Sequence, residues 1–256
     1  MALDSLISIG RKIFQIGTIL LVSILDTQAG TEEDTLSLTD STPKYTMIIT
    51  PRINTAGHFP FTGSLINHNL NADLNIFYSR KTLGFFIFKS YDITDPHSIV
   101  NYFQPGVFAN LPVRENLKLR AVFGYLFSQT TEFRDADSDY YAALAVYWNL
   151  TDRLRIEHTA LFYDYNIDKK LANRFLTSWS SEKIRIDLYL WHRMVIDEQN
   201  HALSSSLALT FPIIKLNEKI LLQLTSSYMG YLTKAKPDYA LRDGFLFTLS
   251  AQVSGH

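Results

Sequence analysis

The sequence predicts an all-β protein: a transmembrane, antiparallel, up-and-down β-barrel of about twelve strands. Three observations support this prediction. Apolar and polar residues alternate with a period of two from Tyr45 onward, and the polar connections between these segments alternate between short and long. No apolar run reaches the roughly 18–20 residues that a membrane-spanning helix needs, so a chain of this composition would cross a bilayer with strands.

The alternation is clearest in two segments. In residues 117–128, the odd-numbered positions are apolar, while the even-numbered positions include Lys118 and Arg120. In residues 184–194, isoleucine and leucine share one face, and charged and aromatic residues share the other. Similar segments, many of them near the 9–11 residues of a tilted spanning strand, are expected at about 45–53, 70–80, 83–92, 100–111, 116–128, 139–150, 153–165, 171–179, 183–196, 201–212, 218–231 and 242–254.

The N-terminal residues predict a secretory signal peptide over residues 1–29. Arg11 and Lys12 precede the mostly apolar run 13–25, and Thr27-Gln28-Ala29 provides small residues for cleavage. This run is short for a membrane span, and Asp26 follows it directly. Residues 30–43 are acidic and hydroxyl-rich, which predicts a flexible leader. The barrel domain is therefore expected over residues 44–256.

The composition excludes several kinds of chemistry. The formal net charge is −1 and the chain has no cysteine, so it shows no nucleic-acid-binding charge pattern and has no disulfide or thiolate metal site. The seven histidines show no short ligand spacing, and no glycine-rich phosphate loop is present. We therefore predict no metal site, no cofactor and no nucleic-acid partner.

The signal peptide, the alternation and the unequal connections together resemble the Gram-negative outer-membrane β-barrel superfamily, over about residues 45–254. The resemblance implies periplasmic short turns, longer extracellular loops, both ends of the barrel domain on the periplasmic side, and membrane lipid as a partner. Other envelope proteins are further candidate partners. Because no diagnostic motif is present, the resemblance indicates a small porin-like architecture and no particular member.

Charged residues fall mainly on the polar face, which a membrane barrel turns toward its lumen. They are either a structural hydrogen-bonded network or an ion-selecting pore lining. Four large residues expected to point inward, Tyr141, Tyr147, Tyr189 and Trp191, would narrow the lumen. The charged residues predicted to line it are Arg52, Asp73, Lys89, Lys118, Arg120, Arg155, Glu157, Arg185, Asp187 and Arg193.

Three other functions compete with a small channel: a structural or partner-binding barrel, a lipid-facing hydrolase, and a soluble periplasmic barrel that binds a small ligand. For the hydrolase, the candidate pair is His192 and Ser205. A hairpin symmetric about residues 198–199 would place them opposite each other with Cβ atoms about 5 Å apart. The His-x-Ser pattern of outer-membrane phospholipases is absent, however, so the main prediction is a barrel without enzymatic activity.

Overall fold

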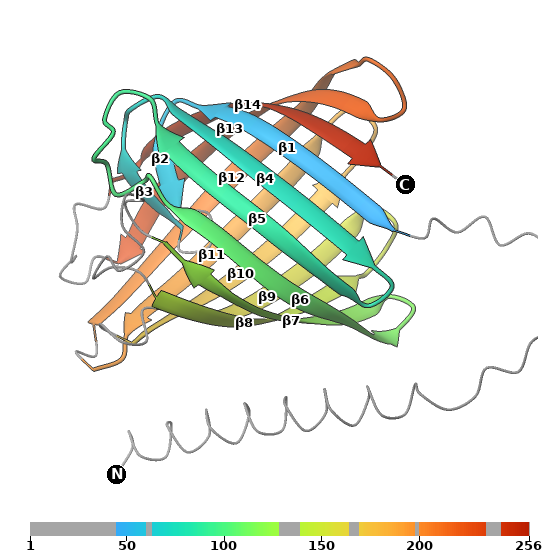
Figure 1. Ribbon diagram of the computed structural model, residues 1–256, viewed down its shortest axis with the longest axis horizontal. Coiled ribbons are helices and arrows are strands. Elements are labelled where there is room, and N and C mark those ends of the chain that lie inside the picture. Colours follow the sequence, from blue (N-terminus) through green and yellow to red (C-terminus); the bar gives the residue numbers. More distant parts are fainter. Residues whose placement is uncertain are drawn as a thin grey trace, which may run out of the picture. The chain divides into compact units, whose positions relative to one another are not determined.

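The computed structural model describes residues 45–59, 63–127, 139–163, 169–197, 200–233 and 242–255, which form a closed antiparallel β-barrel (Figure 1). Two short strands, β2 (Gly57–Phe59) and β3 (Ser64–Asn67), form a separate hairpin. The twelve wall strands are β1 (Thr46–Asn54), β4 (Asn71–Arg80), β5 (Leu83–Asp92), β6 (Phe103–Arg114), β7 (Leu117–Leu126), β8 (Asp139–Asn149), β9 (Leu154–Tyr163), β10 (Lys170–Ser180), β11 (Arg185–Val195), β12 (Asn200–Lys215), β13 (Ile220–Thr233) and β14 (Gly244–Gly255).

Each wall strand pairs with its neighbours in sequence, and β1 pairs with β14 to close the ring. The predicted up-and-down barrel of twelve strands is confirmed, and no predicted strand end differs from the observed one by more than three residues. The predicted signal peptide (residues 1–29) and leader (residues 30–43) lie outside the described residues. No helix among the described residues is long and apolar enough to span a membrane.

The outside of the wall is apolar. Val107, Phe123 and Leu188 are 57%, 51% and 54% exposed, whereas the carboxylates of Asp73 and Asp187 are buried on the inside. A soluble barrel has the opposite arrangement, because its apolar residues must face inward to leave water. The observed polarity is the one that a barrel surrounded by lipid requires.

Aromatic side chains lie near both ends of the wall. At the short-turn end, Tyr78 stacks on Tyr45 and Phe85 with ring centroids 6.0 and 5.3 Å apart. At the loop end, Tyr140 packs edge-on against Tyr125 at 4.9 Å, and Tyr228 packs against Phe245 at the same distance. Aromatic rings at two levels are typical of side chains that lie at the two membrane–water interfaces.

Two glycines in neighbouring strands make room for a large aromatic residue inside the barrel. Gly106 of β6 and Gly124 of β7 are register partners, and a Cβ atom on either would come within 2.4 Å of the Tyr141 hydroxyl oxygen. That hydroxyl donates a hydrogen bond of 3.0 Å to the Pro105 carbonyl oxygen. The ring thus covers the glycine backbone, as aromatic residues often do across strands.

Replacing Gly124 with valine should destabilise the barrel by about 1–3 kcal/mol, the usual cost of inserting volume into a packed interior. The temperature at which the folded band converts to the unfolded band on an SDS gel should fall. Gly230→Val is the matched control, because the nearest atom to a Cβ there is an ordinary 3.4 Å away. Equal conversion temperatures for the two variants would contradict this account of Tyr141.

Candidate functional site

The lumen contains a cavity of about 570 Å³ lined by side chains from all twelve wall strands and from β2. Tyr141, Tyr147, Tyr189 and Trp191 all face it. Tyr189 and Trp191 stack with ring centroids 4.9 Å apart and an interplanar angle of 5°. The four large residues expected to narrow the lumen therefore do lie inside it.

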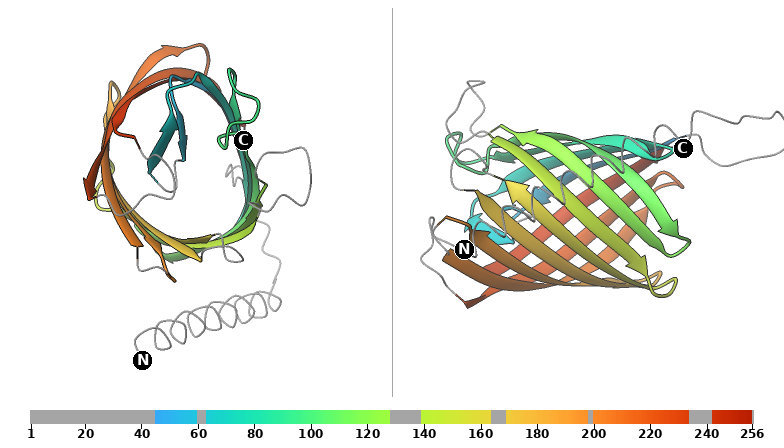
Figure 2. Two further views of the ribbon diagram at one scale, coloured as in Figure 1. Left: turned by 90° about the vertical axis from the view of Figure 1, so that its left-hand side faces the viewer. Right: turned by 90° about the horizontal axis from the view of Figure 1, so that it is seen from below.

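The β2–β3 hairpin narrows the lumen further because it folds into the barrel. In the end-on view of Figure 2 it lies inside the ring of wall strands. Its residues Ala56 and Leu65 are fully buried and form one apolar cluster with Trp191, Met229 and Leu246 of the wall. The segment 54–69, which lies between two of the expected strands, thus contains structure that contributes to the lumen.

Hydrogen bonds join the hairpin to the opposite wall. The Ser204 hydroxyl donates to the Gly63 carbonyl oxygen at 3.0 Å, and Arg193 donates to the Ser64 hydroxyl oxygen at 3.4 Å. Gly63 has a positive φ of 64°, and a Cβ atom there would overlap the Trp191 ring. Glycine is therefore required both for the turn and for the close approach to the indole.

The base of the hairpin is attached by the Asn67 side chain. Its Oδ1 accepts hydrogen bonds from the backbone N–H groups of Gly57 (2.9 Å) and Asn69 (3.2 Å). Its Nδ2 donates to Asp92 Oδ2 at 2.8 Å and to the Ser98 hydroxyl oxygen at 3.1 Å. Asp92 is fully buried, so these bonds connect the hairpin to the end of β5 and to the following loop.

The lumen face carries nine of the ten charged residues predicted to lie there, and Lys89 is the exception. Lys89 is the register partner of Leu74 and shares its side of β5 with the exposed Phe85 and Tyr91, so it points away from the lumen. The alternation is ambiguous in this strand because residues 85–88 are apolar on both faces. The nine on the lumen side are Arg52, Asp73, Lys118, Arg120, Arg155, Glu157, Arg185, Asp187 and Arg193.

Three of the inward carboxylates already have partners. Asp73 accepts hydrogen bonds from the Asn54 side-chain amide at 2.6 Å and from the Ser90 hydroxyl at 2.7 Å. Glu157 forms an ion pair with Arg174 and accepts from the Thr159 hydroxyl at 3.1 Å. Asp187 pairs with Arg185 at 2.9 Å. The charges of Glu157 and Asp187 are thus compensated by arginines, and Asp73, held by neutral donors, is the register partner of Arg52.

Several cations facing the cavity have no such compensation. Within the described residues, neither Arg120 nor Arg155 forms an ion pair with a carboxylate. The Arg120 guanidinium carbon lies 4.6 Å from the centre of the Phe108 ring and 5.0 Å from that of Tyr147, and its Nε donates to Asn110 Oδ1 at 2.8 Å. These contacts fix its position by cation–π attraction and leave its charge in place.

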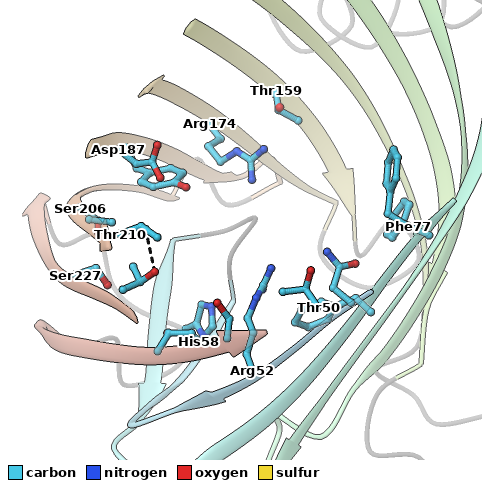
Figure 3. A pocket seen from close by; sticks show the side chains of 18 of the residues that line it. Thr50, Arg52, His58, Phe77, Thr159, Arg174, Asp187, Ser206, Thr210 and Ser227 are labelled. Carbon is cyan, nitrogen blue, oxygen red and sulfur yellow. Dashed lines mark hydrogen bonds between the residues drawn. The ribbon is translucent and has the colours of Figure 1, made fainter. Parts of the chain in front are cut away.

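Arg52 and His58 lie close together where the hairpin meets the wall, and Arg174 and Asp187 lie on the other side of the cavity (Figure 3). Removal of the His58 imidazole from water lowers its pKa, and the positive charge of Arg52 acts in the same direction against the opposing attraction of Asp73. This lowering of its pKa favours the neutral imidazole of His58.

Two contributors to the lumen were missed from the sequence. Arg174 was not among the predicted residues because the alternation in 171–179 is weak, with apolar Ala172 and Leu176 on the same side. The β2–β3 hairpin was also missed. A loop of this length usually has structure of its own, and the segment Pro60-Phe61-Thr62-Gly63 between two short apolar–polar stretches is a turn signal that could have indicated it.

The predicted pairing of His192 with Ser205 is wrong. In the observed register, His192 lies opposite Leu203, and Ser205 lies opposite Leu190. The assumed hairpin centre was one residue too far along the chain, which moves the pairing by two residues. Nor do the described residues gather three histidine or carboxylate side chains that could hold a metal ion.

Comparisons with known proteins agree with the barrel geometry. No protein-family model and no curated protein sequence matches the chain. Several solved structures, however, match the chain in fold. The KdgM porin is 11% identical with a TM-score of 0.56, covering 82% of this chain and 99% of its own. The NanC porin is 8% identical with a TM-score of 0.55, covering 81% and 98%. The COG4313 outer membrane channel from Pseudomonas putida F1 is 10% identical with a TM-score of 0.53, covering 87% and 100%.

The class of protein follows from the apolar outer wall, the polar lumen and the closed ring of strands: this is a transmembrane β-barrel. Its fold is that of the small outer-membrane porins, which it matches over almost their whole length. At these identities the likeness shows the fold alone.

Replacing Asn67 with alanine should loosen the hairpin while leaving the wall intact, because the hydrogen bonds of its side chain are lost and Asp92 loses a donor. Such losses cost about 1–3 kcal/mol, so amide hydrogen exchange in β2 and β3 should accelerate by about tenfold or more. Hydrogen-exchange mass spectrometry measures this directly. His97→Ala, at an exposed position of the loop after β5, is the control. Unchanged exchange in β2 and β3 of the Asn67 variant would contradict the role given to this side chain.

Proposed function

We propose that the protein is a narrow passive channel of the outer membrane that prefers small anionic solutes. One observation carries this proposal: Glu157 and Asp187 are paired with arginines and Asp73 lies opposite Arg52 in the register, whereas Arg120 and Arg155 face the cavity without a carboxylate partner. The surplus charge at the solute's position is therefore positive, although the whole chain has a formal net charge of −1.

The surroundings strengthen this positive field. A lumen enclosed by a low-dielectric wall and lipid focuses the potential of its charges, which raises the local concentration of counter-ions. Of the arginines that form no ion pair within the described residues, Arg155 lies near the short-turn end, Arg120 lies further in, and Arg52 lies toward the loop end opposite Asp73. An anion would meet cationic groups along most of its path through the barrel.

The size of the lumen limits the solute. The cavity of about 570 Å³ and the inward hairpin favour single small molecules or extended chains that pass end first. A KdgM porin has been solved with disordered oligogalacturonate, an acidic oligosaccharide. Carboxylate-bearing sugars are one solute class that arginine side chains would attract here, because guanidinium groups bind carboxylates with two parallel hydrogen bonds.

No catalytic step belongs to this proposal. The register that places Ser205 opposite Leu190 removes the histidine that would have activated its hydroxyl. The outward apolar band makes membrane lipid the main partner of the wall, and the proposal needs no cofactor.

Replacing Arg120 and Arg155 together with glutamine should shift the ion preference of the channel from anions toward cations. In a planar bilayer with a KCl gradient, the reversal potential of the unmodified protein should indicate chloride preference, and that of the double variant should move toward the potassium value. Lys89→Gln, which removes a positive charge from the outside of the wall, should leave the reversal potential unchanged. Arg155→Lys should retain the preference, because the charge is kept.

Two results would overturn the channel proposal. Cation preference in the unmodified protein would show that the lumen charges do not select as argued. A folded, heat-modifiable barrel with no measurable conductance would instead favour a structural or partner-binding barrel.

We also infer that the chain reaches the outer membrane by means of a cleaved signal peptide, supported by Arg11, Lys12 and the apolar run that follows them. N-terminal sequencing of the protein extracted from outer membranes should begin at Gly30. Replacing Ala29 with a bulky residue such as tyrosine should leave the uncleaved precursor, detected as a band about 3 kDa larger. A mature protein that still begins at Met1 would refute this inference.

A further inference from the structure

Two histidines lie next to each other on the outside of the barrel, near its loop end. His192 is three residues from the end of β11, and His201 is the second residue of β12. The Nε2 atom of His192 and the Nδ1 atom of His201 are 3.2 Å apart, and the rings are stacked with an interplanar angle of 13°. They share the outward face, so the transport path through the lumen does not use them.

This separation is the one that two ligands of a single metal ion adopt. Metal–nitrogen bonds of about 2.0–2.1 Å place two imidazole nitrogens about 3.3–3.4 Å apart in tetrahedral geometry and about 2.8–2.9 Å apart in square-planar geometry. The observed distance lies between the two. At present one imidazole nitrogen donates a hydrogen to the other, so at least one lone pair is already directed into the space where the ion would lie.

The position also suits a metal ion taken from water. His201 is exposed and His192 is partly exposed, so an ion from the external solution can reach both rings. The two residues belong to adjacent antiparallel strands whose backbone pairing is continuous from Arg185↔Thr210 to Val195↔Asn200. The ligands are therefore held by the rigid wall, which lowers the entropy lost when the ion binds.

We propose that His192 and His201 form a cross-strand site for a divalent transition-metal ion, with copper preferred. Neutral imidazole is a ligand for copper, nickel and zinc, and affinities for a given site rise along that series to a maximum at Cu²⁺. Water completes the coordination.

Binding requires the ring that now donates its hydrogen to take the other tautomer, with that proton on its remaining ring nitrogen after exchange with water, so that both imidazoles bind the ion in their neutral form. The ion would then connect β11 to β12 close to the loop that joins them. Its expected consequence is a local one: the hairpin opens less readily when the ion is present, because an ion that binds only the folded state stabilises that state.

The test uses the full barrel extracted from membranes in detergent and purified without a histidine tag. CuCl₂ is titrated into the protein, and electron paramagnetic resonance reports whether nitrogen atoms coordinate the ion. One Cu²⁺ per barrel with nitrogen ligands is expected, and ZnCl₂ should bind more weakly. His192→Asn and His201→Asn should each weaken copper binding by about tenfold or more, since even loss of residues that only orient ligands costs 10–100-fold.

His97→Asn removes an exposed histidine elsewhere on the protein and should leave copper binding unchanged. All variants are first required to give the folded, heat-modifiable band, so that a loss of binding cannot arise from unfolding. Copper affinity that is the same in both histidine variants as in the unmodified barrel would overturn the site, as would absence of stoichiometric binding. Zinc affinity equal to that of copper would overturn the preference for copper.

Discussion

The pairing of β1 with β14 is the constraint on which the rest of this structure depends. In a lipid environment an unpaired backbone N–H or C=O group costs several kcal/mol, so a sheet with open edges is excluded from the bilayer. The chain meets this requirement by joining its first and last wall strands from Met47↔Gly255 to Asn54↔Thr248. Closure in turn separates an outside from an inside, and each residue's position in the alternation then decides whether it meets lipid or the lumen.

Closure also creates an interior too wide for wall side chains alone to fill, and the chain fills part of it with its own loop. The β2–β3 hairpin is held inside the barrel by apolar packing and by buried hydrogen bonds, the two kinds of interaction found in the core of a soluble protein. Leu65 and Ala56 pack against Trp191, and Asn67 satisfies buried polar groups around Asp92. The loop end of the barrel is consequently the narrow, packed end, whereas the short-turn end is bordered by exposed cations such as Arg155.

The wall was predictable from the sequence because lipid and lumen impose opposite polarity on successive residues, which leaves a period of two in almost every strand. The exceptions have the same cause. Where both faces are apolar, as in residues 85–88, the pattern no longer distinguishes them, and Lys89 was assigned to the wrong side.

The register between the two strands of a hairpin is set by the turn, and alternation does not reveal it. A shift of the register by two residues leaves every side chain on the same face of the sheet. For that reason His192 was paired with Ser205 instead of approaching His201. The inward hairpin depends on contacts between residues far apart in sequence, such as Gly63 with Ser204, which no local pattern encodes.

The charged residues of the lumen fall into two groups: carboxylates that are held by partners, and arginines that give the lumen its remaining charge. A carboxylate inside the barrel must be paired, and each of Asp73, Glu157 and Asp187 has donors within hydrogen-bonding distance. Arginine does not need a carboxylate to be tolerated at such a site, because its planar cation can also be held by aromatic faces, as Phe108 and Tyr147 hold Arg120. Arginine partners therefore cancel the negative charges of Glu157 and Asp187, and the positive charges that remain are held at fixed positions. A lumen with a residual field of one sign arises in this way from a chain whose total charge is almost zero, so the ion preference of such a barrel has to be derived from its pairings and not from its composition.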